Sequence, residues 1–195
     1  AGLRDAAERG TGPTGAGSIA GTTLAAVVLV APSSWMVVHL GDSRVYAWDG
    51  RELHRLTSDH SLVQELQDAG VIDAEQAERH PDRNVVTRAL GAQDRILPDV
   101  RVLELRLQGE SPAFLVCSDG LTKELDDSGI AQLLAAGADA GELVAAALRA
   151  GGHDNVSAVL VRPEFAGLAD APADEQTLDR RLGDELEDTR PRRRP

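Results

Sequence analysis

Three aspartates, Asp42, Asp119 and Asp154, share a local setting that could serve a metal ion. Asp42 follows the apolar stretch MVVHLG, Asp119 follows FLVCS, and Asp154 precedes Asn155 and a last apolar stretch. Aspartates next to Gly or Asn are ordinary turn residues, so each one alone is consistent with a plain turn. If the three converge at one edge of a sheet, their charges repel unless a cation lies between them. Mg²⁺ and Mn²⁺ prefer such oxygen ligands together with water.

The composition limits the classes of function. A chain of 195 residues is long enough for one domain with a sizeable core. The formal net charge of −12 argues against a broad basic face for nucleic acid and leaves many carboxylates for cations. The one cysteine, Cys117, lies in an apolar run and is predicted to be a core residue rather than a nucleophile. No apolar stretch reaches the ~18 residues of a membrane span and no signal peptide is visible, so we expect a cytoplasmic protein without a membrane segment.

The elements that would carry the aspartates are predicted to be short antiparallel strands. Apolar runs predict strands at 22–30, 35–40, 45–48, 51–56, 100–107, 114–117 and 155–161, with a return toward strand at 80–90. The first of these is expected to be buried. The alternation of Leu103, Leu105 and Leu107 predicts a half-buried strand. Asp49-Gly50 predicts a two-residue hairpin turn.

Helices are predicted in two blocks between the strands. One helix is expected from Ser61, with Gln64 as its capping-box partner, to the stop at Gly70. A second is expected from its cap Asp73 to Pro81. Two more follow residue 120: the first has an apolar face, and the second is capped by Asp139 with Glu142 as its box partner. Blocks of strands and helices indicate an α+β fold with antiparallel sheets rather than a parallel βαβ fold.

Other polar side chains receive more ordinary interpretations. His39 is predicted to lie in the core or to support a ligand of the site, and His60 and His80 to make local caps around the helices between them. Arg44 is expected to pair with nearby carboxylates, and His153 is assigned no role. Residues 1–19 are interpreted as a helix end and a mobile linker, and residues 164–195 as a polar, disordered tail.

Four motifs in a fixed order resemble a known family. GTT before a strand, GDSR, SDGL and GGHDNVSAVLV are similar to the PP2C-type metal-dependent serine/threonine phosphatases of bacteria. Bacterial members also have a helical flap after the second hairpin, which residues 57–88 resemble closely. The resemblance covers about residues 20–163. It implies two antiparallel sheets packed as a sandwich flanked by helices, with a metal centre at one end.

The resemblance also implies the site residues. Asp119 and Asp154 match the family's metal-binding aspartates, and Asp42 matches an aspartate that helps Asp119 to bind a third, weaker ion in bacterial relatives. A backbone carbonyl near Asn84 can join that third site. The neighbouring residues Ser118, Gly120 and Asn155 are candidates for contact with the metal or support of its ligands. The cofactor implied is Mn²⁺ or Mg²⁺, with two ions and, in some relatives, a third.

The function implied is hydrolysis of phosphoserine and phosphothreonine on proteins by a metal-activated water, in opposition to bacterial Ser/Thr kinases. The family's phosphate-gripping arginine, its Asn-Glu-Asp run and its Asp-Gly-x-Gly-Gly strand end are not found before Ala20. We therefore expect an N-terminally incomplete phosphatase domain. The alternative is a truncated or pseudophosphatase module that binds metal or phosphoprotein without turnover.

Overall fold

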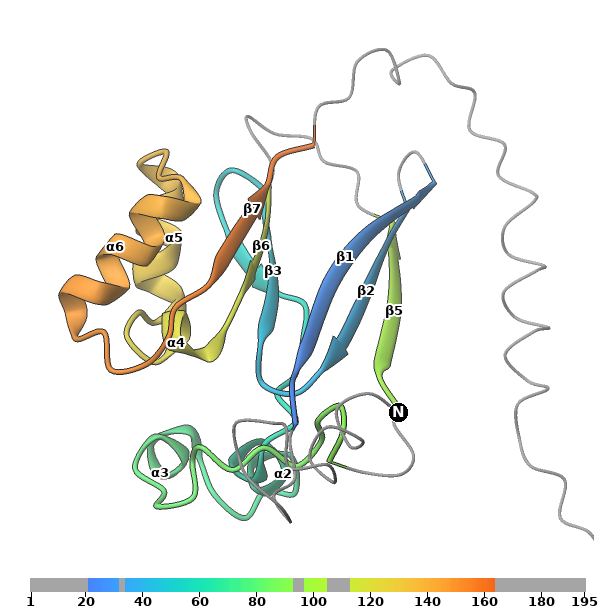
Figure 1. Ribbon diagram of the computed structural model, residues 1–195, viewed down its shortest axis with the longest axis vertical. Coiled ribbons are helices and arrows are strands. Elements are labelled where there is room, and N and C mark those ends of the chain that lie inside the picture. The colour runs from blue at the N-terminus through green and yellow to red at the C-terminus, as the bar shows by residue number, and fades with distance from the viewer. Residues whose placement is uncertain (1–20, 32–33, 93–96, 105–112, 164–195) are drawn as a thin grey trace, which may run out of the picture. The chain divides into compact units, whose positions relative to one another are not determined.

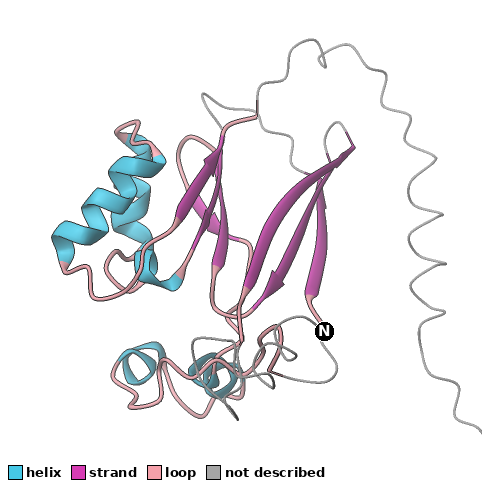
Figure 2. Ribbon diagram, viewed as in Figure 1, coloured by secondary structure: helices cyan, strands magenta, loops and turns pink. Residues whose placement is uncertain are grey.

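The fold contains two antiparallel β-sheets and several helices, which confirms the predicted α+β class (Figure 1, Figure 2). The computed structural model describes residues 21–31, 34–92, 97–104 and 113–163. One sheet has the order β1-β2-β5, formed by Leu24–Ala31, Ser34–Leu40 and Asp99–Glu104. The other has the order β4-β3-β6-β7, formed by Leu53–Arg55, Arg44–Trp48, Ala113–Cys117 and Ala158–Val161. The predicted linker at 1–19 and tail at 164–195 lie outside the described residues.

The second sheet is covered on both faces. Trp35 of β2 packs against Phe114 of β6, with ring centroids 4.7 Å apart, and Ala47 of β3 joins them between the sheets. On the opposite face, Leu115 and Cys117 pack against the helices through Leu121, Ile130 and Leu143. Burial raises the pKa of the Cys117 thiol to about 12. The prediction that Cys117 is a core residue is confirmed.

The first sheet is more exposed than predicted. In β1, Leu24, Val28, Leu29 and Val30 are each at least 38% exposed, so the expectation of a buried strand is wrong. In strand β5, Leu103 is partly buried between the exposed Val102 and Glu104, as its predicted alternation requires; Leu105 and Leu107 lie outside the described residues. Both strands flank β2 at the edges of a three-stranded sheet. An apolar run predicts a strand, but not how many neighbours will cover it.

The β3–β4 hairpin has a longer loop than predicted. Trp48 pairs with Leu53, so four residues connect the strands instead of two. The Asp49 carboxylate accepts the backbone N–H groups of Arg51 at 2.8 Å and Glu52 at 2.7 Å. The side chain of Asp49 therefore takes over hydrogen bonds that a tight two-residue turn would have made within the backbone.

The helices are found where the caps predict them. They are α2 (Leu62–Asp68), α3 (Ala74–Glu78), α4 (Asp119–Thr122), α5 (Asp127–Ala135) and α6 (Ala140–Ala150). The capping box of Asp139 with Glu142 is present. Ser61 caps α2 as expected, but the Gln64 side chain donates to Asp68 at 2.9 Å, so the predicted box is only half formed. Within the described parts of the chain, no helix is long and apolar enough to cross a membrane.

The predicted strand at 80–90 is not formed. The segment contributes two isolated bridges, Ser61 to Val86 and Thr22 to Leu90, and is otherwise made of turns and irregular structure. His80 accepts the backbone N–H of Asp82 at 3.1 Å, which confirms its expected local role.

Candidate metal centre

The strand register brings the three aspartates to one edge of the second sheet. Arg44, the first residue of β3, pairs with Cys117, the last residue of β6. Cys117 also pairs with Ala158, the first residue of β7. The turn before β3 and the loop before β7 therefore both end beside the start of the helix that follows β6. These segments carry Asp42, Asp119 and Asp154 respectively.

Ser118 and Gly120 hold the Asp154 loop against the start of α4. The Ser118 hydroxyl donates to the carbonyl of Asn155 at 3.2 Å and accepts the N–H of Ser157 at 3.0 Å. A Cβ atom on Gly120 would lie 2.3 Å from the same Asn155 carbonyl oxygen, so no side chain fits there. Asn155 also donates its backbone N–H to Asp154 at 2.8 Å. These contacts keep Asp119 and Asp154 together.

A lysine that the sequence reasoning did not single out joins the two carboxylates. The Nζ atom of Lys123 lies 2.5 Å from Asp119 Oδ2 and 3.0 Å from Asp154 Oδ2. The hydrogen bond from Lys123, followed by that from the Asn155 N–H, lowers the pKa of the Asp154 carboxyl. Burial alone would lower the pKa of Lys123, but its bonds to the two aspartates raise it. One cationic atom thus already contacts both candidate ligands.

Asp42 is electrostatically coupled to this pair. Burial, and then the negative charge of Asp119, raise the pKa of the Asp42 carboxyl. A cation near Asp42 and Asp119 would relieve that repulsion. Asn84 is exposed in the turn after α3, and among the described residues no hydrogen bond joins it to any of the three aspartates. The structure therefore brings Asp42 and Asp119 within electrostatic range, and the role of the carbonyl near Asn84 stays a prediction.

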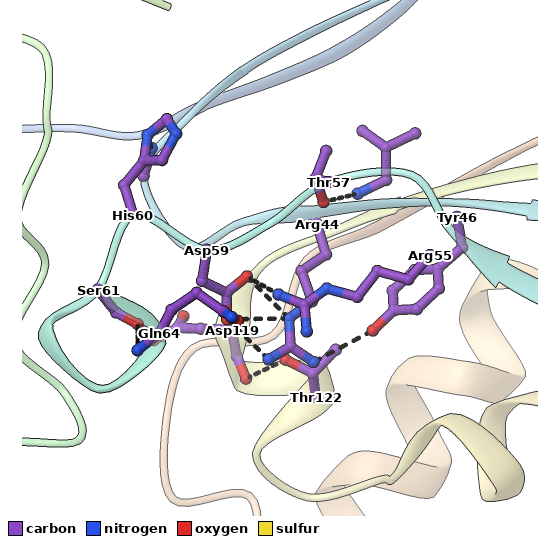
Figure 3. A network of polar contacts seen from close by, with 12 residues as sticks. Arg44, Tyr46, Arg55, Thr57, Asp59, His60, Ser61, Gln64, Asp119 and Thr122 are labelled. Carbon is purple, nitrogen blue, oxygen red and sulfur yellow. Dashed lines mark hydrogen bonds and ion pairs between the residues drawn. The ribbon is translucent and has the colours of Figure 1, made fainter. Parts of the chain in front are cut away.

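An ionic network next to Asp42 fixes the segment that leads into α2 (Figure 3). The Arg44 guanidinium donates to both oxygens of Asp59, with the shortest bond 2.7 Å, and Arg55 donates to Asp59 at 2.6 Å. Arg44 also donates to the Tyr46 hydroxyl, which donates to Asp127 at 2.8 Å. The predicted pairing of Arg44 with nearby carboxylates is confirmed. The Arg44 guanidinium is occupied by its bonds to Asp59, so it is not free to bind a substrate.

A second polar cluster lies on the other side of the Asp42 turn. His39 and His60 are each only 2% exposed, and one potential ligand atom from each, together with one from Asp99, lies within 4.8 Å of the others. The Nδ1 atom of His60 accepts the Gly41 N–H at 3.0 Å, and its Nε2 lies 3.1 Å from Asp99. With Nδ1 used as an acceptor, Nε2 carries the proton and donates to Asp99. His60 is therefore not available as a metal ligand in this arrangement.

The cluster instead holds the backbone that precedes Asp42. The His60 N–H also donates to the Gly41 carbonyl at 2.8 Å, so this residue binds both sides of Gly41. Gly41 has φ +109°, and a Cβ atom there would lie 2.3 Å from Thr23 Cγ2. The expected local capping role of His60 is wrong, because its ring contacts a residue 19 positions away. His39 is buried as predicted.

His153 also has a contact that the sequence did not reveal. Its backbone N–H and its Nδ1 both lie within hydrogen-bond distance of Glu124 Oε1, at 3.0 and 2.8 Å. These two contacts lower the pKa of the Glu124 carboxyl, the backbone bond more than the ring. Glu124 is the second residue after α4, next to Lys123. The residue before Asp154 is therefore bonded to the same end of α4 that carries Lys123.

Comparison with known proteins agrees with this architecture. Residues 5–158 match the family model for protein phosphatase 2C. The protein phosphatase PhpP of Streptococcus pneumoniae is 41% identical over 146 residues, which is 72% of this chain and 57% of PhpP. The serine/threonine phosphatase of S. agalactiae superposes with a TM-score of 0.70 at 36% identity, covering 83% of this chain and 66% of that one.

A further solved structure shows a relative with metal. The catalytic domain of the phosphatase PstP in complex with two manganese ions is 35% identical and has a TM-score of 0.60, covering 72% of this chain and 57% of that one. The chain spans a little over half the length of PhpP. The residues matched by the family model, 5–158, include all three aspartates and every described strand except the last residues of β7. The chain belongs to the protein phosphatase 2C family.

Proposed function

We propose that this chain carries the metal centre of a phosphoprotein phosphatase that hydrolyses phosphoserine and phosphothreonine. The observation that carries the proposal is the contact of one cationic nitrogen, Lys123 Nζ, with both Asp119 and Asp154. A Mg²⁺ or Mn²⁺ ion needs its oxygen ligands at about 2.1 Å, a closure of less than about 1 Å for each carboxylate. The donor set is therefore suited to the ion.

The residues of the chain would have separate roles at this metal centre. Asp119 and Asp154 would hold an ion between α4 and the loop before β7. Asp42 would add a negative charge beside Asp119, since the charge of Asp119 already raises the pKa of the Asp42 carboxyl. When bound, divalent ions lower the pKa of water and neutralise charge on the phosphoryl oxygens. Ser118 and Gly120 would keep the ligands in register, because both contact Asn155 directly.

The substrate class is proposed from the relatives. The similar proteins PhpP and PstP are named as protein phosphatases, and PstP as specific for serine/threonine. Segment 57–88 would select among phosphoproteins, including those modified by Ser/Thr kinases. Helix α2 has no fully buried residue and α3 has only Ala77, so these helices are held by little buried area. Cytoplasmic location stays a prediction of the sequence.

One observation favours a second candidate function. The Lys123 ammonium pairs with both carboxylates without any metal and offsets part of their charge. A domain held in that state would bind phosphoprotein without turnover. This candidate predicts phosphopeptide binding that does not depend on Mn²⁺, whereas the first predicts hydrolysis that does.

The two candidates are separated by an isosteric change at Asp119 that removes its charge. Calorimetry with Mn²⁺ and hydrolysis of a phosphothreonine peptide would be measured for the wild type, Asp119→Asn and the control Glu75→Gln. Glu75 is 70% exposed in an ion pair with Arg79 on α3. We expect Asp119→Asn to weaken Mn²⁺ binding at least about tenfold and to abolish hydrolysis, because a carboxylate ligand is lost. Equal affinity in all three proteins would exclude Asp119 as a ligand.

A further inference from the structure

Lys123 is the only lysine in the sequence, and it lies four residues after Asp119. Its backbone N–H donates to the Asp119 carbonyl at 2.8 Å, at the end of the short helix α4. This bond fixes the root of the lysine side chain close to the aspartate. The backbone of Lys123 therefore stays near Asp119 even when the contacts of the ammonium break.

The ammonium uses the oxygen atoms that a metal ion would need. It contacts Oδ2 of Asp119 and Oδ2 of Asp154. Among the described residues, no other cationic side chain pairs with either carboxylate. A lysine ammonium and a divalent ion cannot both occupy the space between the same two oxygens, because their charges repel and their radii overlap.

The geometry also permits the lysine to leave. The Lys123 side chain is 37% exposed, and those of Asp119 and Asp154 are 30% and 46% exposed. Four rotatable bonds connect the ammonium to the backbone. The side chain can therefore turn into solvent without disturbing α4, while a metal takes its place.

We infer that Lys123 is an internal competitor for the divalent cation at Asp119 and Asp154, so that metal binding requires displacement of its ammonium. The inference rests on the proposed metal site and adds a means of setting its affinity. Two effects of opposite sign follow. Lys123 stabilises the protein without metal by reducing the repulsion between two neighbouring carboxylates, and it weakens the binding of metal to the same carboxylates.

The first test compares Lys123→Gln with the wild type and with the control Arg79→Gln. The control also removes a cation from an ion pair, because the Arg79 side chain at the end of α3 is 77% exposed and pairs with Glu75. Calorimetry measures Mn²⁺ affinity, and thermal unfolding is followed in chelator and in saturating Mn²⁺. We expect Lys123→Gln to bind Mn²⁺ at least threefold more tightly. We also expect Lys123→Gln to unfold at a lower temperature than the wild type in chelator, and its unfolding temperature to rise more than that of the wild type when Mn²⁺ is added. Arg79→Gln should match the wild type in affinity.

The conservative variant Lys123→Arg sharpens the test. It keeps a cation that reaches both carboxylates, so its Mn²⁺ affinity should stay close to that of the wild type or fall below it. A structural role for the lysine stem would instead make Lys123→Gln less stable in both chelator and Mn²⁺, with unchanged affinity. That result would overturn the inference.

A spectroscopic test follows the ammonium itself. Protein labelled with ¹⁵N-lysine has one side-chain ammonium group, because the chain has one lysine. Its NMR signal in chelator should report an ion-paired group, and Mg²⁺ should shift it toward the position of free lysine with the same midpoint as calorimetric binding. A signal that stays in place at saturating Mg²⁺ would overturn the inference.

Asp119→Asn separates the two possible failures. If the wild type binds Mn²⁺, Asp119→Asn weakens it and Lys123→Gln leaves it unchanged, then the metal site stands and only the competition is wrong. If neither the wild type nor Lys123→Gln binds Mn²⁺, the metal site is wrong and the competition with it.

Discussion

The two polar clusters near Asp42 are held in different ways. His60 is 2% exposed and is fixed by directional hydrogen bonds to the backbone of Gly41 and to Asp99. The Asp119–Lys123–Asp154 cluster is 30–46% exposed and is joined through one flexible side chain. Buried bonds to the backbone set where the Asp42 turn lies, whereas exposed charges can exchange partners. The first cluster should therefore respond to mutation through stability, and the second through cation affinity.

The largest effect should come from the contact that holds the exposed cluster together. In Gly120→Ala the new methyl group would lie 2.3 Å from the Asn155 carbonyl oxygen and 2.9 Å from its carbon, so the Asp154 loop must move. We expect a loss of about 2–3 kcal/mol in the free energy of unfolding, as for overpacked sites. Mn²⁺ binding should fall at least about tenfold, because the two ligands separate. Urea unfolding and calorimetry measure these quantities.

Gly21→Ala is the matched control for that variant. Its new methyl group would meet the nearest atom, Ala89 Cβ, at an ordinary contact distance of 3.4 Å. Equal behaviour of the two variants would show that the close approach of Gly120 to Asn155 is not needed.

Removal of the buried imidazole should have the next largest effect. His60→Ala leaves the Gly41 N–H without its acceptor and opens space beside His39. We expect a loss of about 2 kcal/mol in stability, from the unpaired donor and the cavity. Chemical denaturation measures it, with His54→Ala as the control because the His54 side chain is 51% exposed. Similar small losses in both variants would contradict the assigned role of His60.

The sequence predicted the general fold well because its signals are local. The run Phe114–Cys117 and its stop at Ser118 predict where β6 ends, and the caps Asp73 and Asp139 predict where α3 and α6 begin. The contact of His60 with Gly41 depends on how two distant segments meet, and no pattern near either residue indicates it. Likewise, the exposure of β1 depends on its place at the edge of a sheet.

The candidate site was predicted only in part for the same reason. The three aspartates share a visible setting at strand ends. Lys123 looks like an ordinary helix-surface lysine until α4 begins at Asp119, which places the two residues one turn apart. Its second contact, with Asp154, needs the loop before β7 to return to α4. Only the register of β6 with β7 brings that about.

A smaller effect is expected from the charge of Asp42. The pKa of this carboxyl is raised above its usual value by burial and by Asp119, so its ionisation opposes folding when no metal is bound. The favourable contribution of this carboxyl is complete below the unfolded pKa and is lost as pH rises through the folded pKa. In chelator at pH 7, Asp42→Asn should therefore be more stable than the wild type, by less than about 1 kcal/mol after solvent screening.

Two further conditions check the sign of this difference in stability. The difference between Asp42→Asn and the wild type in chelator should disappear as the pH falls below about 4. In saturating Mn²⁺ the order should reverse, because the ion needs the carboxylate. Thermal unfolding under the three conditions measures this. A variant that is less stable than the wild type in chelator would contradict the repulsion between Asp42 and Asp119.

The smallest effect is expected from the contact between Glu124 and His153, which supports the exposed cluster. Glu124 Oε1 accepts the His153 N–H, and Glu124→Gln keeps an oxygen that can accept the same bond. The His153 side chain is 83% exposed and that of Glu124 is 8% exposed, so the solvent around the ring screens its attraction to the carboxylate, and loss of that attraction should change little. We expect Mn²⁺ affinity to fall roughly twofold, within the range of exposed ion pairs. The control Glu65→Gln, exposed on α2, should leave affinity unchanged. A tenfold loss in Glu124→Gln would mean that the position of Asp154 depends on a charge at the helix end. The exposed cluster would then be as firmly held as the buried one, and the contrast between the two would fail.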